Sequence, residues 1–121
     1  MRLVSCALAL AALLVAAAHA QDTTVYTPGD GVSLPKVVRH VAPQYTSEAM
    51  RQMIEGVVVL DVVVKSDGKV GDVTVKQSLD AVYGLDESAI KAMKQWEFEP
   101  GTKDGKAVAV RVEVNMAFTL H

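Results

Sequence analysis

The sequence predicts an α+β fold, a two-layer sandwich in which two helices pack on one face of a three-stranded antiparallel sheet. Residues 108–120 alternate apolar and polar side chains with the period of two typical of a half-buried strand. A valine-rich run over 56–65 is followed by a turn signal and a second strand over 70–77. Two amphipathic segments have helical spacing, so the predicted order is helix, strand, strand, helix, strand.

The first twenty residues predict a secretory signal peptide. Arg2 precedes an apolar run over 7–18, and Ala18-His19-Ala20 has the small-x-small pattern of a cleavage site before Gln21. The run is too short for a bilayer core of about 30 Å, so no membrane insertion of the mature chain is expected. Cys6 lies before the apolar region, whereas a lipobox cysteine follows it. We therefore expect export and cleavage between Ala20 and Gln21.

The predicted domains are a signal peptide (1–20), a flexible lead-in (21–34) and one folded domain (35–121). The lead-in contains the turn sequence Pro28-Gly29-Asp30-Gly31. Cys6 is the one cysteine of the chain, so packing must stabilise the mature domain without disulfides. The chain has 12 Lys+Arg, including Arg2, against 14 Asp+Glu. This balance excludes the basic surface that a nucleic-acid partner requires.

The folded domain is predicted to begin with an arm and a short helix. Residues 32–41 are extended in character, but Pro35 cannot donate to a ladder, so we expect them to lie over the domain and outside any sheet. A helix over 46–54 would be capped by Thr46 or Ser47 and ended by Gly56. Its expected apolar face consists of Ala49, Met50, Met53 and Ile54.

A β-hairpin is predicted over 56–77, with its turn at Ser66-Asp67-Gly68-Lys69. The expected core face consists of Val58, Leu60, Val62 and Val64 with Val73 and Val75. Asp61 is expected to face water on the other side. The same side carries Val57, Val59 and Val63, for which two interpretations stay open: the N-terminal arm covers them, or they form an exposed dimerisation patch.

The second helix is predicted to follow a loop over 78–84. Asp86 is the expected N-cap, with Leu85 and Ile90 forming a hydrophobic staple. The expected buried stripe consists of Ala89, Ile90, Met93 and Trp96.

The chain then leaves the helix in an extended conformation through Trp96-Glu97-Phe98-Glu99-Pro100-Gly101, because Pro100 cannot continue a helix. A turn at Lys103-Asp104-Gly105-Lys106 leads into the last strand.

The last strand is predicted to have one core face and one wet face. Its core residues are Val108, Val110, Val112, Val114, Met116, Phe118 and Leu120, and Arg111, Glu113, Asn115 and Thr119 alternate with them. The strand order, 2-1-3 or 1-2-3, is not decided by the pattern, but the last strand is expected at an edge. Such an edge is either protected or offered to a partner.

An ordered set of motifs resembles the C-terminal domain of the TonB energy-transducer family over 35–120. The motifs are Pro43-Gln44-Tyr45, Glu55-Gly56-Val57-Val58, Asp67-Gly68-Lys69-Val70, Leu85-Asp86 with Ala89, the Trp96–Gly101 stretch, and the strand over 110–118.

The resemblance implies a periplasmic, non-enzymatic protein-binding domain without a cofactor, acting in TonB-dependent transport or a related envelope system. It implies capture of an extended segment of an outer-membrane transporter or other envelope protein by strand addition at the last strand, here Val108–Phe118. The family's second contact region corresponds to Ala42-Pro43-Gln44-Tyr45.

Two departures from the family pattern affect these expectations. No membrane helix or Pro-rich spacer is present, so the chain is expected to have no energy transduction of its own. Ala42 stands where familiar members have Gln, and Thr46 stands where they have Pro. These changes weaken a role for the side chain at position 42, whereas backbone pairing needs no particular side chain.

Other functions have less support in the sequence. Serines are accounted for by caps, turns and loops, and His40 and His121 are the histidines of the mature chain, which predicts neither a catalytic triad nor a metal site. A self-assembling scaffold homodimer through the same edge stays open. So does a secreted cystatin-like inhibitor, because Gln52-Met53-Ile54-Glu55-Gly56 resembles the Gln-x-Val-x-Gly wedge.

Overall fold

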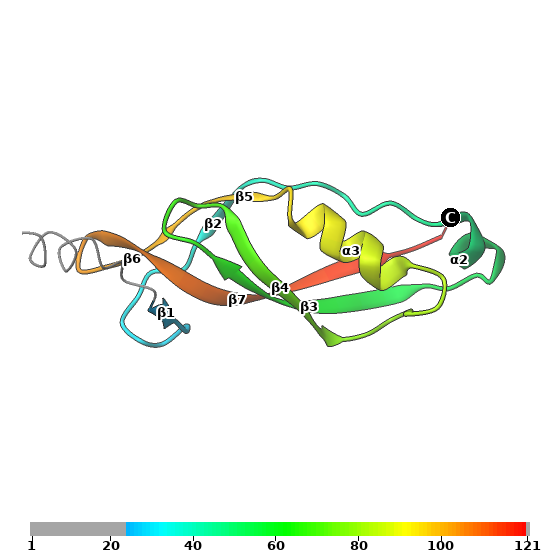
Figure 1. The fold of residues 1–121 in the computed structure, drawn as a ribbon, viewed down its shortest axis with the longest axis horizontal. Coiled ribbons are helices and arrows are strands. Elements are labelled where there is room, and N and C mark those ends of the chain that lie inside the picture. The colour runs from blue at the N-terminus through cyan, green and yellow to red at the C-terminus, as the bar shows by residue number, and fades with distance from the viewer. Residues whose placement is uncertain (1–23, 121) are drawn as a thin grey trace, which may run out of the picture.

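The computed structural model describes residues 24–120, which form an elongated α+β domain (Figure 1). The predicted signal peptide and its cleavage position lie outside these residues. The strands are β1 (Val25–Tyr26), β2 (Lys36–Arg39), β3 (Gly56–Val64), β4 (Val70–Gln77), β5 (Glu97–Glu99), β6 (Gly101–Lys103) and β7 (Lys106–Phe118), and the helices are α2 (Ser47–Arg51) and α3 (Leu85–Met93). Over residues 24–120, no helix has the length and hydropathy needed to cross a bilayer.

The centre of the fold is an antiparallel sheet of the three predicted long strands. β3 lies between β7 and β4, which is the 2-1-3 order. Nine consecutive residue pairs, from Gly56 with Phe118 to Val64 with Val110, join β3 to β7 without interruption. The β3–β4 ladder is less regular, with two register shifts.

The sheet is larger than the predicted three strands, because β1 and β6 also pair with β7 to give a mixed five-stranded sheet. β1 adds in parallel beside Ala109 and Val110. β6 forms a hairpin with β7 through Asp104 and Gly105, whose φ angles of 52° and 79° suit a two-residue turn. Two- and three-residue strands are too short to show a period, so the sequence does not predict them.

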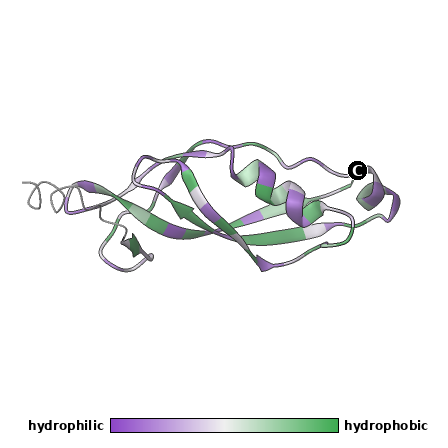
Figure 2. Cartoon of the chain, in the orientation of Figure 1, coloured by the Kyte–Doolittle hydropathy of each residue, from purple (hydrophilic) through white to green (hydrophobic). Residues whose placement is uncertain are grey.

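The core lies between α3 and the three long strands. Figure 2 shows hydrophobic residues along β3 and β7. Val58, Leu60, Val62 and Val64 are all fully buried, which confirms the predicted core face of β3. The cluster also includes Leu85, Ala89, Ala92, Met93, Phe98, Met116 and Phe118. Burial of these apolar side chains supplies the main stabilisation of a domain whose described part has no disulfide.

α2 is shorter than the predicted helix. Thr46 is its N-cap and accepts a hydrogen bond from the Ala49 N–H at 3.2 Å, as predicted. The prediction that Met50 and Met53 belong to its buried apolar face is wrong, since their side chains are 48% and 77% exposed. Met53 has a left-handed φ of 55°, which ends the helix before its face can extend. A single turn at the end of the domain has room to bury Ala49 alone.

α3 begins at Leu85 with Gly84 as N-cap, so the prediction of Asp86 as N-cap is wrong. Asp80 satisfies the first donors of the helix, because its carboxylate accepts from the Leu85 N–H at 3.2 Å and its carbonyl accepts from the Asp86 N–H at 3.1 Å. The same buried carboxylate accepts from the Val82 and Tyr83 N–H groups in the preceding loop. Asp86 points back into the loop and accepts hydrogen bonds from Ser78 and the Leu79 and Asp80 N–H groups.

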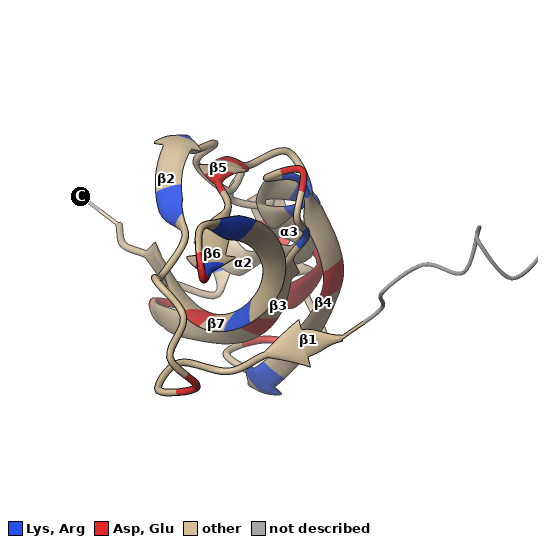
Figure 3. Ribbon diagram, turned by 90° about the vertical axis from the view of Figure 1, so that its left-hand side faces the viewer, with Lys and Arg blue, Asp and Glu red and all other residues tan. Residues whose placement is uncertain are grey.

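The arm over 32–41 enters a sheet, contrary to prediction. Lys36–Arg39 pairs with Glu97–Glu99 in a separate two-stranded sheet, β2–β5. This small sheet lies on the α3 side of the three long strands (Figures 1 and 3). Val41, at the end of the arm, packs against the core cluster. The arm therefore does not cover Val57, Val59 and Val63 on the opposite face, and that interpretation is wrong.

Candidate partner-binding edge

The peptide groups of β7 alternate between its two edges, and the hairpin shows which residues face which edge. The Lys65 N–H donates to Lys69, and the Lys65 carbonyl accepts from Gly68, both at 2.9 Å. Odd residues of β3 therefore face β4, and even residues face β7. The β3–β7 register pairs even-numbered residues of one strand with even-numbered residues of the other, so the even residues of β7 face β3. The odd residues of β7 therefore direct their N–H and C=O groups away from β3. The Leu120 N–H, which donates to Glu55 on the β3 side at 2.7 Å, fits this alternation.

The outer edge of β7 is occupied at one end and unpaired at the other. β1 lies beside Ala109 and Val110, and within residues 24–120 no strand pairs with that edge further along. We call residues 111–118 the open edge. Its outward peptide groups include those of Glu113, Asn115 and Ala117.

The structure brings most of the predicted edge residues together. Arg111, Val112, Glu113, Val114, Asn115, Met116 and Phe118 all lie on the open edge. Val108 and Val110 do not, because Val108 pairs with Gly101 and Val110 lies beside Tyr26.

The open edge differs in regularity from the edges formed by β4 and β2. β4 has two register shifts, and β2 follows Pro35, carries Lys36 and has a shift between Val37 and Arg39. Bulges, proline and lysine are the devices by which proteins protect edges from pairing. The open edge belongs to a strand with no shift over nine pairs, and its described residues include neither proline nor lysine.

A small charge network lies on the outer face beside the open edge. Lys76 Nζ contacts the Glu113 carboxylate at 2.6 Å, and each side chain is about half exposed. The hydrogen bond and charge of Glu113, with the charge of Asp61, raise the pKa of Lys76. Asp61 is only half-buried, as predicted. The network holds the Glu113 side chain over the sheet and leaves its backbone facing outward.

The second predicted contact region, Ala42-Pro43-Gln44-Tyr45, lies along α3 and reaches the far end of β7. The Tyr45 ring meets the Phe118 ring edge-on, with centroids 5.4 Å apart, and its hydroxyl donates to the Ile54 carbonyl. Burial, and then the charge of Glu55, raise the pKa of Tyr45. Tyr45 therefore fixes this region at the end of the sheet.

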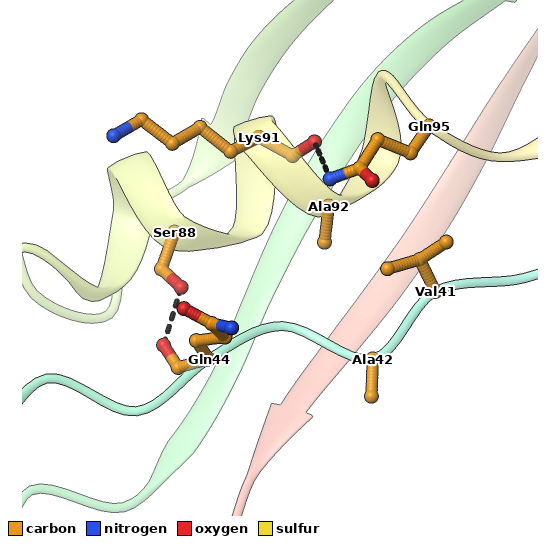
Figure 4. Close-up of a pocket in the computed structure, with 7 residues that line it drawn as sticks. All are labelled: Val41, Ala42, Gln44, Ser88, Lys91, Ala92 and Gln95. Carbon is orange, nitrogen blue, oxygen red and sulfur yellow. Dashed lines mark hydrogen bonds between the residues drawn. The ribbon is translucent and has the colours of Figure 1, made fainter.

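Two shallow cavities lie between this region and α3. One, of about 250 Å³, is lined by Val41, Ala42, Gln44, Ser88, Lys91, Ala92 and Gln95 (Figure 4). The other, of about 220 Å³, shares Gln44, Ser88 and Lys91. The Ser88 hydroxyl donates to the Gln44 carbonyl between them.

Sequence reasoning missed Ser88, Lys91 and Gln95 as lining residues. Their spacing of three and four residues, which is that of one helix face, was the available signal.

The predicted structural-motif residues are not part of the open edge, although Gly56 pairs with Phe118 from the β3 side. The Gly68 carbonyl accepts from the Phe98 N–H at 2.8 Å, and a Cβ on Gly68 would lie 2.1 Å from the Phe98 carbonyl oxygen. Asp67 accepts from the Lys69 N–H at 2.9 Å within the turn, and Pro100 lies beside Gly68. Gly56 leaves room for Leu79, since its Cβ would lie 2.6 Å from that side chain.

Comparisons with known proteins agree with this geometry. Residues 41–120 match the family model described as Gram-negative bacterial TonB protein C-terminal. Protein TonB of Vibrio cholerae is 36% identical over 87 residues, which are 69% of this chain and 34% of that protein. Protein tonB2 of Pseudomonas aeruginosa is 38% identical over 80 residues, 66% of this chain and 29% of that protein.

A solved structure gives the same result for the fold. The solution NMR structure of the Pseudomonas aeruginosa TonB CTD superimposes with a TM-score of 0.61 at 29% identity, covering 82% of this chain and 97% of that one. The chain spans about a third of the length of the curated TonB relatives it matches. The chain belongs to the Gram-negative bacterial TonB protein C-terminal family.

Proposed function

We propose that this protein binds an extended segment of another envelope protein by strand addition at the open edge of β7. After export and removal of residues 1–20, it would act in the periplasm, in TonB-dependent transport or a related envelope system. The proposed partner is an outer-membrane transporter or another envelope protein. The observation that carries the proposal is the regular, unpaired edge over residues 111–118.

Backbone pairing supplies the affinity in this mode of recognition. The outward N–H and C=O groups of Glu113, Asn115 and Ala117 lie on one edge at the spacing of a strand, so an added segment can pair with all three. Its side chains would alternate between the outer face, beside Glu113 and Lys76, and the helix face, beside the half-buried Val112 and Val114.

The 42–45 region is the proposed second contact. It reaches the end of the same strand through the contact of Tyr45 with Phe118. The cavities beside Gln44 can accept a side chain from residues of the partner that lie outside the paired stretch. Two separated contacts would strengthen binding relative to the open edge alone.

The test begins by identifying the partner in cells. A photo-crosslinking residue at Asn115 should capture an envelope protein, and one at Gln77, on the opposite edge of the sheet, should not capture the same protein. A synthetic peptide of the crosslinked segment is then titrated against the purified chain and its variants.

Proline substitutions separate backbone pairing from side-chain contact. Asn115→Pro removes an outward N–H at an edge, a position where proline is tolerated, and should abolish peptide binding while the domain stays folded. Asn115→Ala keeps the N–H and should bind like the parent. Val112→Pro removes a donor of the β3–β7 ladder and should destabilise the domain instead. Equal binding by Asn115→Pro and the parent would eliminate strand addition at this edge.

A further inference from the structure

One short strand of the chain already lies on the edge that the proposed partner would use. β1, Val25–Tyr26, pairs with β7 in parallel, Val25 beside Ala109 and Tyr26 beside Val110 (Figures 1 and 3). It occupies the outer edge, opposite β3, immediately before the open edge begins. A partner strand that extended along β7 past Arg111 toward the start of the strand would meet Tyr26.

β1 is short and partly exposed. It has two residues, and Val25 is 39% exposed. The Lys103 ammonium lies over the Tyr26 ring, 4.6 Å from its centroid. A surface cation–π contact and a two-residue pairing are small terms, so β1 can leave the edge at modest cost.

A turn directs the chain away from β7 directly after β1. The Thr27 N–H and hydroxyl donate to the Asp30 carboxylate at 3.0 and 2.9 Å, and the Asp30 N–H donates to the Thr27 carbonyl at 3.1 Å. The two bonds to the carboxylate, that of the Thr27 N–H first and that of its hydroxyl second, lower the pKa of Asp30. The turn is what leaves residues 111–118 unpaired, because a strand continuing from Tyr26 in the same direction would cover them.

The chain is fixed again a few residues later, at Ser33. The Ser33 N–H donates to the Thr102 carbonyl at 2.8 Å, the Thr102 N–H donates to the Ser33 hydroxyl at 2.9 Å, and the two hydroxyls lie 2.8 Å apart. Gly29 and Gly31 lie in between, and a Cβ at either would have no neighbour within 4 Å. β1 can therefore detach while the chain stays anchored at Ser33.

We propose that β1 is a displaceable internal occupant of the partner edge, and that the partner segment has the chemistry of β1 and its flanks. This proposal rests on the proposed function and deepens it. The segment Thr24-Val25-Tyr26-Thr27 shows what the edge accepts: a short stretch of threonine, β-branched and aromatic residues running parallel to β7. A partner of this kind displaces β1 and continues along the open edge, where β1 turns away.

The probe is a synthetic peptide that copies β1 and replaces its turn with strand residues. Its sequence is Thr-Thr-Val-Tyr-Thr-Val-Thr-Val-Thr, with two N-terminal lysines for solubility and a fluorescent label. Binding to the full chain is measured by fluorescence polarisation. Tyr26→Pro, which removes a backbone donor from β1, releases the internal strand, and Tyr26→Phe, which keeps both donor and ring, is the matched control.

The release variant should bind the peptide at least about five-fold more tightly than the parent, as expected when a competing contact is removed. Tyr26→Phe should bind like the parent, and a peptide of reversed sequence should bind more weakly. Equal affinities of Tyr26→Pro and the parent for the peptide would contradict the proposal that β1 competes for the edge. If the reversed peptide binds as tightly as the original one, the proposal that the segment runs parallel to β7 is wrong. No binding to Tyr26→Pro at about 1 mM peptide overturns the proposed partner chemistry.

Asn115→Pro separates a failure of this inference from a failure of the proposed function. Combined with Tyr26→Pro, it should weaken peptide binding, because the peptide reaches the open edge. If Asn115→Pro weakens binding while Tyr26→Pro gains nothing over the parent, the open edge binds segments but β1 does not compete. If Asn115→Pro has no effect on bound peptide, the open edge itself is not the binding site.

Discussion

The indole Nε1 of Trp96 donates a hydrogen bond to the backbone carbonyl of Val41 at 2.9 Å. This contact joins the chain leaving α3 to the segment that leads into the predicted second contact region. The His40 and Phe98 rings lie on either side of Trp96, with centroid distances of 5.8 and 6.1 Å. Trp96 therefore both fills the end of the core and positions the 42–45 region.

Two substitutions of Trp96 should separate these roles. Trp96→Phe keeps a ring but loses the hydrogen bond to Val41, and should lower the free energy of unfolding by about 1 kcal/mol. Trp96→Ala also loses the packing and should cost about 3–5 kcal/mol. Urea denaturation followed by circular dichroism measures both. Equal costs for the two variants would show that the hydrogen bond, not the ring, carries the stabilisation.

Gly68 should tolerate a methyl group far less well than Gly105. Both have left-handed φ angles, 85° and 79°, so alanine at either is strained by about 1–2 kcal/mol. A Cβ on Gly68 would also lie 2.1 Å from the Phe98 carbonyl oxygen, whereas Gly105 has nothing within 4 Å. Gly68→Ala should therefore cost about 1–3 kcal/mol more than Gly105→Ala in thermal unfolding. Equal costs would mean that backbone strain alone explains both.

The free energy of unfolding should depend on pH through Asp86, near the start of α3. Burial alone would raise the pKa of Asp86, but hydrogen bonds from Ser78, Asp80 and Leu79 outweigh it and hold the pKa below the usual 3.8. A carboxyl group with a depressed folded-state pKa contributes stability above its unfolded-state pKa. That contribution is lost as the pH falls through the folded-state value.

Asp86→Asn should therefore be less stable than the parent at neutral pH, and the difference should shrink below about pH 4. Free energies of unfolding measured from pH 6 to about pH 2 test this, with Asp72→Asn on exposed β4 as the charge-matched control. If the difference in free energy of unfolding between Asp86→Asn and the parent stays constant over this range, the substitution acts through packing and not through the carboxylate charge.

The Lys76–Glu113 pair should matter little for stability. Both side chains are about half exposed, so a double-mutant cycle with Lys76→Gln and Glu113→Gln should give little or no coupling free energy. Raising the salt concentration should reduce it further. A coupling that is larger and insensitive to salt would show that the pair is shielded from solvent.

The three long antiparallel strands could be predicted from the sequence because β7 alternates with a period of two, and β3 is a run of β-branched residues followed by a turn signal. Ser66-Asp67-Gly68-Lys69 identifies the hairpin, and the fully buried Val58 and Leu60 confirm the choice of face. β1, β2 and β5 have two to four residues and form through contacts distant in sequence, which no local pattern reports. β6 has three residues, so the sequence indicates its turn to β7 but not the strand itself. Met53 lies at the helical spacing that predicts burial, but α2 ends before it, and the sequence pattern does not show where the helix ends.

The candidate site was predictable as a strand but not as an edge. Alternation identifies Val112 and Glu113 as facing opposite sides of the sheet, but it does not tell which of the two directs its N–H away from β3. That assignment needs the pairing of β3 with both neighbours. The occupation of Ala109 and Val110 by β1 also lies beyond sequence reasoning, because Pro28-Gly29-Asp30-Gly31 indicates a turn and not what the residues before it contact.

The central claim is that the outward backbone of the open edge captures an extended segment. Its most direct test is the affinity of the crosslinked partner peptide for Asn115→Pro relative to Asn115→Ala, measured by calorimetry on chains with matched circular dichroism spectra. Strand addition predicts parent-like binding by Asn115→Ala and a loss of at least about ten-fold for Asn115→Pro. Equal affinities of the two variants would contradict it.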